Sequence, residues 1–207
     1  MSYSIEAALN HPQIEQVIVS TDSQEIAQVA LEWGAQVPFI RPAELATDTA
    51  PELEAWQHAI RFCQTQPQWH SFSTFISLPA TAPLRSEDDV TRCLELFGQS
   101  NFDLVVTGSI ASRSPWFNMV KKKDDGAIEL VLPSQHTRRQ DTPQVFDLTT
   151  VAYVSSPQYI LNSQNVMQGR IGLVEIPRER AIDIDEPLDF EIAECLLARR
   201  MCEQDTR

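Results

Sequence analysis

Apolar positions along the first half of the chain alternate between two spacings. Short apolar runs, typical of buried strands, occur at residues 16–20, 37–40, 72–78 and 102–107. Apolar residues at helical spacing occur at residues 26–33, 53–63 and 90–97, and residues 4–10 fit the end of a helix that stops before Pro12. Because strand and helix alternate, the pattern favours an α/β fold with a doubly wound, mostly parallel sheet.

The rhythm changes after Ser109. Two extended stretches, residues 114–120 and 128–132, flank a charged turn and predict an antiparallel pair. Further strands are predicted at residues 151–154, 171–176 and 182–184, and an amphipathic helix at residues 187–201. The sequence contains no internal repeat and no linker, so we expect one domain over residues 1–207, with an inserted segment at about residues 109–170.

Polar residues mark the expected helix starts. Ser86 with Asp89 opens the helix that runs to Phe97. Asp22 with Glu25 fits the cap of the helix at residues 26–33, and on local grounds we interpret Asp22 in this way. A cap needs only a side-chain oxygen, so this interpretation gives Asp22 a structural role and no role in binding or catalysis.

Composition and charge restrict the possible partners. The 207 residues are 43% hydrophobic, enough for a substantial core, and the net charge of −13 disfavours both nucleic acids and anionic membranes. Four cysteines lack the spacing of a metal finger and are typical of reduced thiols. The first residues do not resemble a signal peptide and no segment has the length of a membrane span, so we expect a cytoplasmic protein.

The stretch from Ala181 to Phe190 carries the most suggestive chemistry. Residues two apart in a strand point to the same side, so Asp183 and Asp185 would present two carboxylates to one small volume. Such a pair suits Mg²⁺, which proteins bind through one or two carboxylates together with substrate phosphates. The alternative is that one or more acids of this stretch cap the helix that begins near Pro187.

Five motifs in order carry a family resemblance. They are Val17-Ile18-Val19-Ser20-Thr21-Asp22-Ser23, the segment Arg41 to Ala50, Thr81-Ala82-Pro83-Leu84-Arg85, Arg138-Arg139-Gln140 and Ile182-Asp183-Ile184-Asp185. Over residues 4–198 the chain resembles the acylneuraminate cytidylyltransferases, also called CMP-sialic acid synthetases. The resemblance implies a Rossmann-like nucleotidyltransferase fold and a homodimer in which a projecting segment reaches the neighbour's site. It also implies Mg²⁺-dependent transfer of CMP from CTP to a nonulosonic, sialic-acid-like sugar acid, with release of pyrophosphate.

The resemblance assigns roles to single residues. It implies that Asp183 and Asp185 hold the Mg²⁺, that Asp22, Arg41, Thr81 and Arg85 bind the nucleotide, and that Arg139 and Gln140 bind the sugar acid. Arginine suits such a site because it meets a carboxylate or a phosphate with two parallel hydrogen bonds.

The sequence also departs from the family pattern. It lacks the family's first strand and its phosphate loop of the type A-R-x-G-S-K, so we expect little transferase activity from the chain as written. Pro79 replaces a glutamine, Thr149-Thr150 replaces Asn-Gly, and Glu52 replaces a small hydroxyl residue. Two alternatives therefore stay open: a non-catalytic relative that acts as a dimerising or scaffold subunit, and a cytidylyltransferase for an eight-carbon ulosonic acid.

Overall fold

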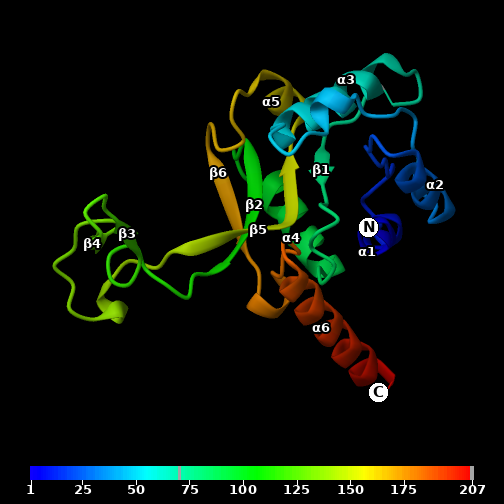
Figure 1. Cartoon of the computed structure of the whole chain (residues 1–207). Helices are drawn as coiled ribbons and strands as arrows, with labels where there is room; N and C mark the ends of the chain where they lie inside the picture. The colour runs from blue at the N-terminus through cyan, green and yellow to red at the C-terminus, as the bar shows by residue number, and fades with distance from the viewer. Residues whose placement is uncertain (70, 206–207) are drawn as a thin grey trace.

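A four-stranded sheet forms the centre of the protein (Figure 1). The computed structural model describes residues 1–69 and 71–205, with side chains up to residue 202. The strands are β1 (Phe75–Ser77), β2 (Leu104–Ile110), β5 (Phe146–Ser155) and β6 (Ile171–Glu175), in the spatial order β1-β5-β2-β6. The α/β class is confirmed, but the sheet is mixed rather than mostly parallel: β2 and β6 are parallel, whereas β5 is antiparallel to both β1 and β2.

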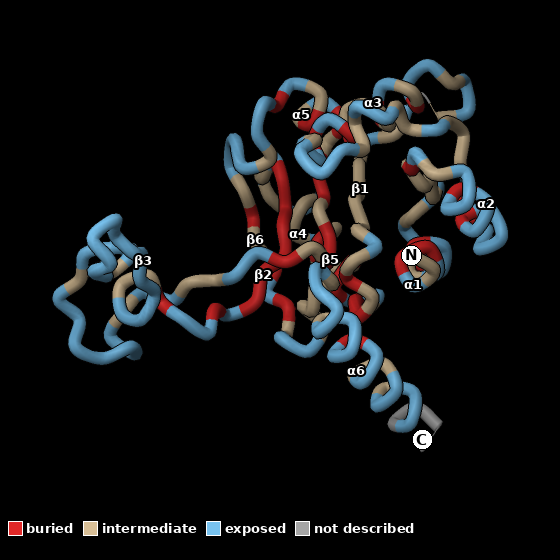
Figure 2. The backbone as a smooth tube through the Cα atoms, in the orientation of Figure 1, coloured by how far each residue is buried: buried red, intermediate tan, exposed pale blue. Residues whose placement is uncertain are grey.

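Helices cover both faces of this sheet. The helix α4 (Glu87–Gln99) contacts β2, β5 and β6, and its Cys93 shares a core with Val105, Val154 and Val174. On the other face, α3 (Glu52–Thr65) and α5 (Pro157–Asn162) pack together, and Trp56 contacts the rings of Phe75 and Tyr153. Figure 2 shows that burial concentrates along the central strands.

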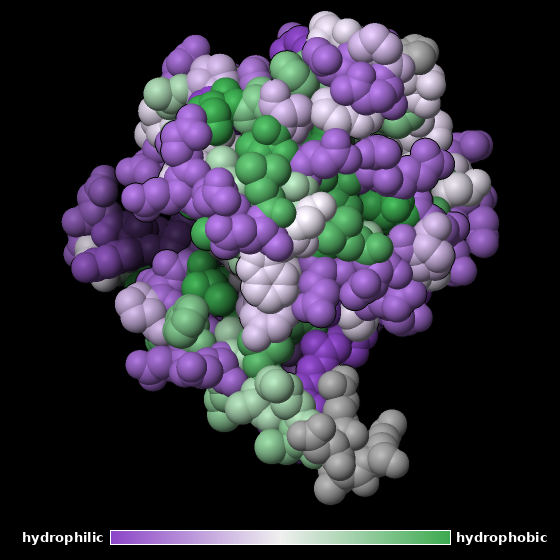
Figure 3. Space-filling model, turned by 90° about the vertical axis from the view of Figure 1, so that its right-hand side faces the viewer, coloured by the Kyte–Doolittle hydropathy of each residue, from purple (hydrophilic) through white to green (hydrophobic). Residues whose placement is uncertain are grey.

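The first third of the chain forms less sheet than its pattern predicts. The two runs at residues 16–20 and 37–40 are reduced to a single parallel bridge between Ile18 and Gln36. The helices α1 (Ser2–Asn10) and α2 (Gln24–Glu32) bury Ile5 and Ala30 in a small core of their own. On the face that carries α1, α2 and β1, apolar side chains gather in the centre between polar margins (Figure 3).

The segment between β2 and β5 projects away from the sheet. We call residues 111–145 the arm, and its base is closed by a hydrogen bond from Ala111 N to Val145 O of 3.0 Å. It contains an antiparallel pair, as predicted, and the short helix η2 (Arg139–Asp141). The second strand, β4 (Ile128–Leu130), lies where it was predicted, but the first, β3 (Val120–Lys122), begins at the end of the predicted stretch 114–120 and includes residues expected in the charged turn. In Figure 1 the arm extends to the side opposite α1 and α2.

The helix starts confirm one prediction and correct another. Ser86 and Asp89 form a reciprocal capping box at α4, as expected. The cap of α2 is Ser23, whose side chain accepts from Ile26 N at 3.3 Å, so the assignment of Asp22 as the cap was wrong by one residue. Aspartate and serine are both favourable at a helix N-cap, and in this structure the hydroxyl of Ser23 occupies that position.

The end of the chain also differs from its prediction. Residues 182–184 form no strand, because the chain turns through η3 (Arg178–Arg180) after β6 and then runs extended to α6 (Pro187–Asp205). The sequence reasoning missed α5 and the three short helices η1 (Ala43–Leu45), η2 and η3.

Candidate nucleotidyltransferase site

Asp183 and Asp185 lie in the extended segment between η3 and α6. One backbone hydrogen bond, from Ile184 N to Thr81 O at 2.9 Å, attaches this segment to the loop before α4. Asp185 is exposed, whereas Asp183 is partly buried, and its Oδ1 atom is fully buried with no hydrogen-bond partner among the described residues. A buried carboxylate oxygen without a donor is unfavourable unless a cation or another ligand meets it.

The capping alternative applies to a different acid of the same stretch. Asp189 Oδ2 accepts from Glu186 N at 2.9 Å and from Asp185 N at 3.2 Å, so Asp189 closes the start of α6. The structure shows no capping bond to the carboxylates of Asp183 or Asp185, within residues 1–69 and 71–205. Both carboxylates remain available to a ligand.

The donor set at Asp183 fits a hard divalent cation. Among the described residues no group of three or more histidine, cysteine or acidic side chains could hold a metal by itself. Two carboxylate ligands suit Mg²⁺, which completes its coordination with water and substrate phosphates.

Other acidic groups face the same region. Burial raises the pKa of Glu52, and the nearby Asp183 raises it further, although a hydrogen bond with Trp56 opposes the shift. Burial, with Glu52 and Asp183 in the same direction, raises the pKa of Tyr153 to about 12. Negative charge therefore accumulates around Asp183, and a bound cation would relieve it.

Asp22 and Arg41, both expected to bind the nucleotide, lie close together. Arg41 Nη2 lies 3.8 Å from Asp22 Oδ1, and Arg41 N donates to Thr21 O at 2.8 Å. Arg41 Nε and the hydroxyl of Ser20 are buried without partners in the described part of the chain. This corner thus holds a cation, an acid and two polar atoms that a polar ligand could satisfy.

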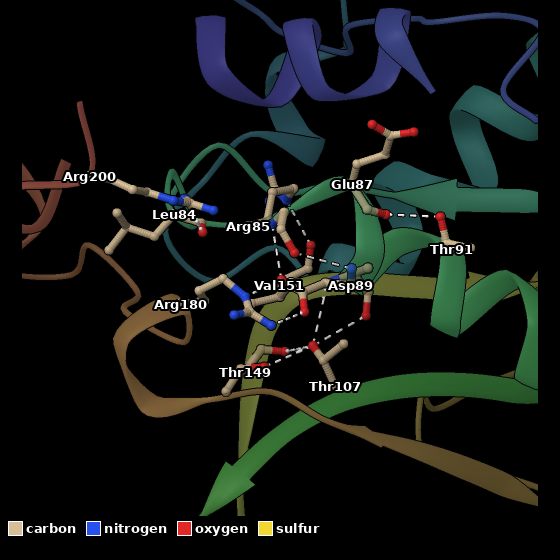
Figure 4. A network of polar contacts seen from close by, with 12 residues as sticks. Leu84, Arg85, Glu87, Asp89, Thr91, Thr107, Thr149, Val151, Arg180 and Arg200 are labelled. Carbon is tan, nitrogen blue, oxygen red and sulfur yellow. Dashed lines mark hydrogen bonds and ion pairs between the residues drawn. The ribbon is translucent and has the colours of Figure 1, made fainter. Parts of the chain in front are cut away.

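Arg85 occupies a different environment from the one expected of a nucleotide ligand. It is 5% exposed, and its guanidinium donates to Val151 O (Figure 4). It also donates to Ser4 Oγ and to Pro79 O. Burial lowers its pKa to about 10, with Asp89 opposing. Arg85 therefore faces inward and fixes the loop that carries Thr81, instead of being presented to solvent.

Arg139 and Gln140 line a pocket of about 340 Å³ at the base of the arm. Arg139 Nη2 donates to Ala111 O at 2.9 Å, which holds η2 against the end of β2. Arg113 lines the same pocket and was missed by the sequence reasoning, where its only signal was a lone cation after a strand. The pocket is thus lined by two arginines and by two glutamines, Gln140 and Gln144.

Solved structures of nucleotidyltransferases share this fold. The CMP:2-keto-3-deoxy-manno-octonic acid synthetase matches with a TM-score of 0.66 and 14% identity, over 96% of this chain and 87% of that one. A 4-diphosphocytidyl-2C-methyl-D-erythritol synthase from Anaerococcus prevotii matches with a TM-score of 0.61 and 11% identity, over 94% and 89% of the two chains. At this identity the likeness concerns the fold, which is of the Rossmann-like type.

Relatives by sequence are more similar. The post-translational flagellin modification protein B of Campylobacter coli is 34% identical over 97% of this chain and 84% of its own length. The CMP-N,N'-diacetyllegionaminic acid synthase of Campylobacter jejuni is 33% identical over 96% and 83%, and a pseudaminic acid cytidylyltransferase of the same species is 29% identical over 95% and 84%. The family described as Cytidylyltransferase matches residues 1–125. The chain therefore belongs to the cytidylyltransferase family.

Proposed function

We propose that the protein transfers CMP from CTP to a nonulosonic acid. The observation that carries the proposal is the match to a CMP-N,N'-diacetyllegionaminic acid synthase along 96% of the chain. The buried Oδ1 atom of Asp183 in this chain, which has no hydrogen-bond partner among the described residues, supports it. In this reaction a hydroxyl oxygen of the sugar acid bonds to the α-phosphorus of CTP, the bond to pyrophosphate breaks, and the hydroxyl proton is released.

Asp183 and Asp185 would hold a divalent cation, with Mg²⁺ as the expected ion. When bound, the cation supplies positive charge to the phosphate oxygens, where negative charge develops in the transition state. Arg41, oriented by Asp22, would contact the cytidine, and the Thr81 loop would lie against the nucleotide. Arg85 would act indirectly, by holding that loop.

The pocket at the arm would receive the sugar acid. Arg139 and Arg113 suit its carboxylate, and Gln140 can donate and accept hydrogen bonds with hydroxyl or acyl groups. A second copy of the chain would complete the site, because the arm projects from the sheet and carries exposed apolar residues. These are Phe117, Met119, Val120, Ile128, Val131 and Leu132.

No described helix has the length and apolarity that crossing a bilayer requires. Cys63, Cys93 and Cys195 form no disulfide in the described part of the chain, as expected of a protein in a reducing, cytoplasmic location.

The test is CMP-sugar formation from CTP and Mg²⁺ with a panel of acids: legionaminic, pseudaminic, N-acetylneuraminic and 3-deoxy-manno-octulosonic. We expect measurable but low turnover with a nine-carbon acid, because the sequence contains no phosphate loop of the type A-R-x-G-S-K. Asp183→Asn and Asp185→Asn should each reduce turnover by about 10²-fold, because each removes charge from the phosphate site. Asp189→Asn is the matched control, since it removes an acid from the same stretch but keeps an oxygen for the α6 cap.

Two results would contradict the proposal. If the Asp183→Asn and Asp185→Asn variants turned over as fast as the unmodified chain, this segment would not hold the metal. Absence of product with every acid, from a folded dimer, would favour the non-catalytic subunit.

A further inference from the structure

Arg180 and Asp89 form a two-pronged ion pair between η3 and α4. Arg180 Nε donates to Asp89 Oδ2 at 2.8 Å, and Arg180 Nη2 donates to Asp89 Oδ1 at 2.8 Å (Figure 4). The Asp89 side chain is fully buried, whereas that of Arg180 keeps 24% of its surface. The planar guanidinium meets the planar carboxylate along two parallel bonds, which fixes orientation as well as distance.

Asp89 is itself held rigidly. Its Oδ2 accepts from Ser86 N at 3.0 Å, and its backbone N donates to Ser86 Oγ at 3.3 Å. Burial alone would raise the pKa of this carboxyl, but hydrogen bonds from Arg180 and Ser86 outweigh burial and hold the pKa below its usual value. Arg180 therefore binds an ionised group whose position is set by the first turn of α4.

The loop before α4 is anchored from several directions. Arg85 donates to Val151 O on β5, and Arg200 of α6 donates to Leu84 O at 2.9 Å (Figure 4). The loop and the start of α4 thus provide a fixed platform for whatever binds to them.

Asp183 lies between two attachments to this platform. Three residues before it, Arg180 is bound to Asp89, and one residue after it, Ile184 N is bound to Thr81 O. The segment has no ladder of its own, because residues 181–184 form no strand. Without the Arg180 attachment, the backbone hydrogen bond to Thr81 O and the packing of Ala181 against the core would have to hold Asp183 toward the Thr81 loop.

We propose that Arg180 and Asp89 are positioning residues for the divalent-cation site at Asp183 and Asp185. This inference rests on the proposed function, because it takes the two carboxylates as the cation's ligands. Neither Arg180 nor Asp89 touches the cation or the substrates. The pair sets the path of the chain, so that the buried oxygen of Asp183 stays where a cation can reach it.

Charge and position predict opposite effects for one substitution. Arg180→Met removes a positive charge near the cation, so electrostatics alone would tighten cation binding. If Arg180 positions Asp183, the same substitution weakens binding because the carboxylate loses its fixed place. Arg180→Lys keeps the charge but cannot form the two-pronged pair, so electrostatics predicts no change and positioning predicts weaker binding.

The experiment measures binding of Mn²⁺ alone, by the electron paramagnetic resonance signal of free Mn²⁺, in the 207-residue protein. We expect Arg180→Met to raise the Kd about tenfold or more, as for partners that orient metal ligands, and Arg180→Lys to raise it by a smaller factor. Arg178→Met is the matched control, since Arg178 is an exposed arginine of the same short helix. It should leave the Kd unchanged.

The outcomes separate the two proposals. If Asp183→Asn does not weaken Mn²⁺ binding, the metal site itself is wrong. If Asp183→Asn abolishes binding but both Arg180 variants bind as tightly as the unmodified chain or more tightly, the positioning role is wrong. Circular dichroism at the assay temperature establishes that each variant is folded. If Arg180→Met does not fold, Arg180→Lys alone decides.

Discussion

Thr107 and Thr149 bind each other across a break in the register of β2 and β5. Thr149 Oγ1 donates to Thr107 Oγ1 at 2.8 Å, and Thr107 Oγ1 donates to Thr149 O at 3.0 Å. Thr107 is completely buried, and its hydroxyl also accepts from Ala152 N at 3.3 Å. The two threonines thus satisfy backbone groups that the irregular ladder leaves without regular partners.

Replacing this hydroxyl should destabilise the protein. Thr107→Val keeps the shape but leaves Ala152 N and the Thr149 hydroxyl unsatisfied, which should lower the free energy of unfolding by about 1–3 kcal/mol. Thr107→Ser keeps the hydroxyl and should cost less. Urea denaturation measures both, and equal stability of Thr107→Val and the unmodified chain would contradict the role assigned to the pair.

Arg85 should matter more for stability than for any direct contact with nucleotide. Arg85→Met removes the guanidinium donor from Val151 O, Ser4 Oγ and Pro79 O, of which Pro79 O keeps a hydrogen bond from the Ser4 hydroxyl, and we expect a loss of about 3 kcal/mol. Thermal unfolding without ligand is the measurement, with Arg61→Met as an exposed control. A variant that unfolds normally but binds CTP poorly would instead support direct contact.

The arm should mediate dimerisation. Ile128 on β4 is 66% exposed, and Ile128→Glu would place a charge in an apolar interface, so we expect the dimer to dissociate. Met201→Glu changes an apolar residue of α6 that is 63% exposed and should leave the dimer intact. Sedimentation at micromolar concentration gives the oligomeric state of both variants and of the unmodified chain. If the unmodified chain is a monomer, the proposed dimer is wrong.

The cysteines should differ in reactivity. Burial raises the pKa of Cys93 to about 12, so its thiol stays protonated in the folded state, whereas Cys195 is exposed. Iodoacetamide at pH 8 should modify Cys195 and leave Cys93 intact until the protein unfolds, as mass spectrometry would show. Rapid modification of Cys93 in the folded protein would show that this part of the core opens.

The Cys93 thiol should also make the stability of the protein depend on pH. An unfolded cysteine ionises near pH 8.5, so the raised pKa of Cys93 contributes stability that is complete below about pH 8.5. That contribution is lost as the pH rises toward 12. Cys93→Ala should show a shallower loss of stability over this range, measured by urea unfolding at each pH.

Local signals in the sequence predicted the helices well. The capping box of Ser86 and Asp89 depends on residues three apart, and the structure contains it. The helix α5 carries an equally local signal, a Ser156 cap followed by Pro157, and could have been found. Asp22 failed as a cap because Ser23 next to it offers the same chemistry.

Features that depend on distant pairing could not be read from the pattern. The antiparallel direction of β5 follows from the return of the chain through the arm, and an apolar run is the same in either direction. Residues 182–184 alternate like a strand, but no strand within residues 1–69 and 71–205 pairs with them. Arg85 looked like a cation at a loop end, and its burial depends on Ser4 and Val151, which lie far away in the sequence.

The closed base of the arm has a consequence for how the protein can diversify. Because Ala111 and Val145 are hydrogen-bonded neighbours, residues 111–145 form a single closed connection between β2 and β5. The cost of closing such a connection grows only slowly with its length, by about 0.6 kcal/mol for each doubling. Insertions, deletions and exchanges in the arm can therefore accumulate between related genes at little cost to the folding of the sheet. Recombination that exchanges arms between relatives should yield folded chimaeras. In these, the proposed nucleotide site and the proposed sugar-acid pocket at the arm would come from different ancestors.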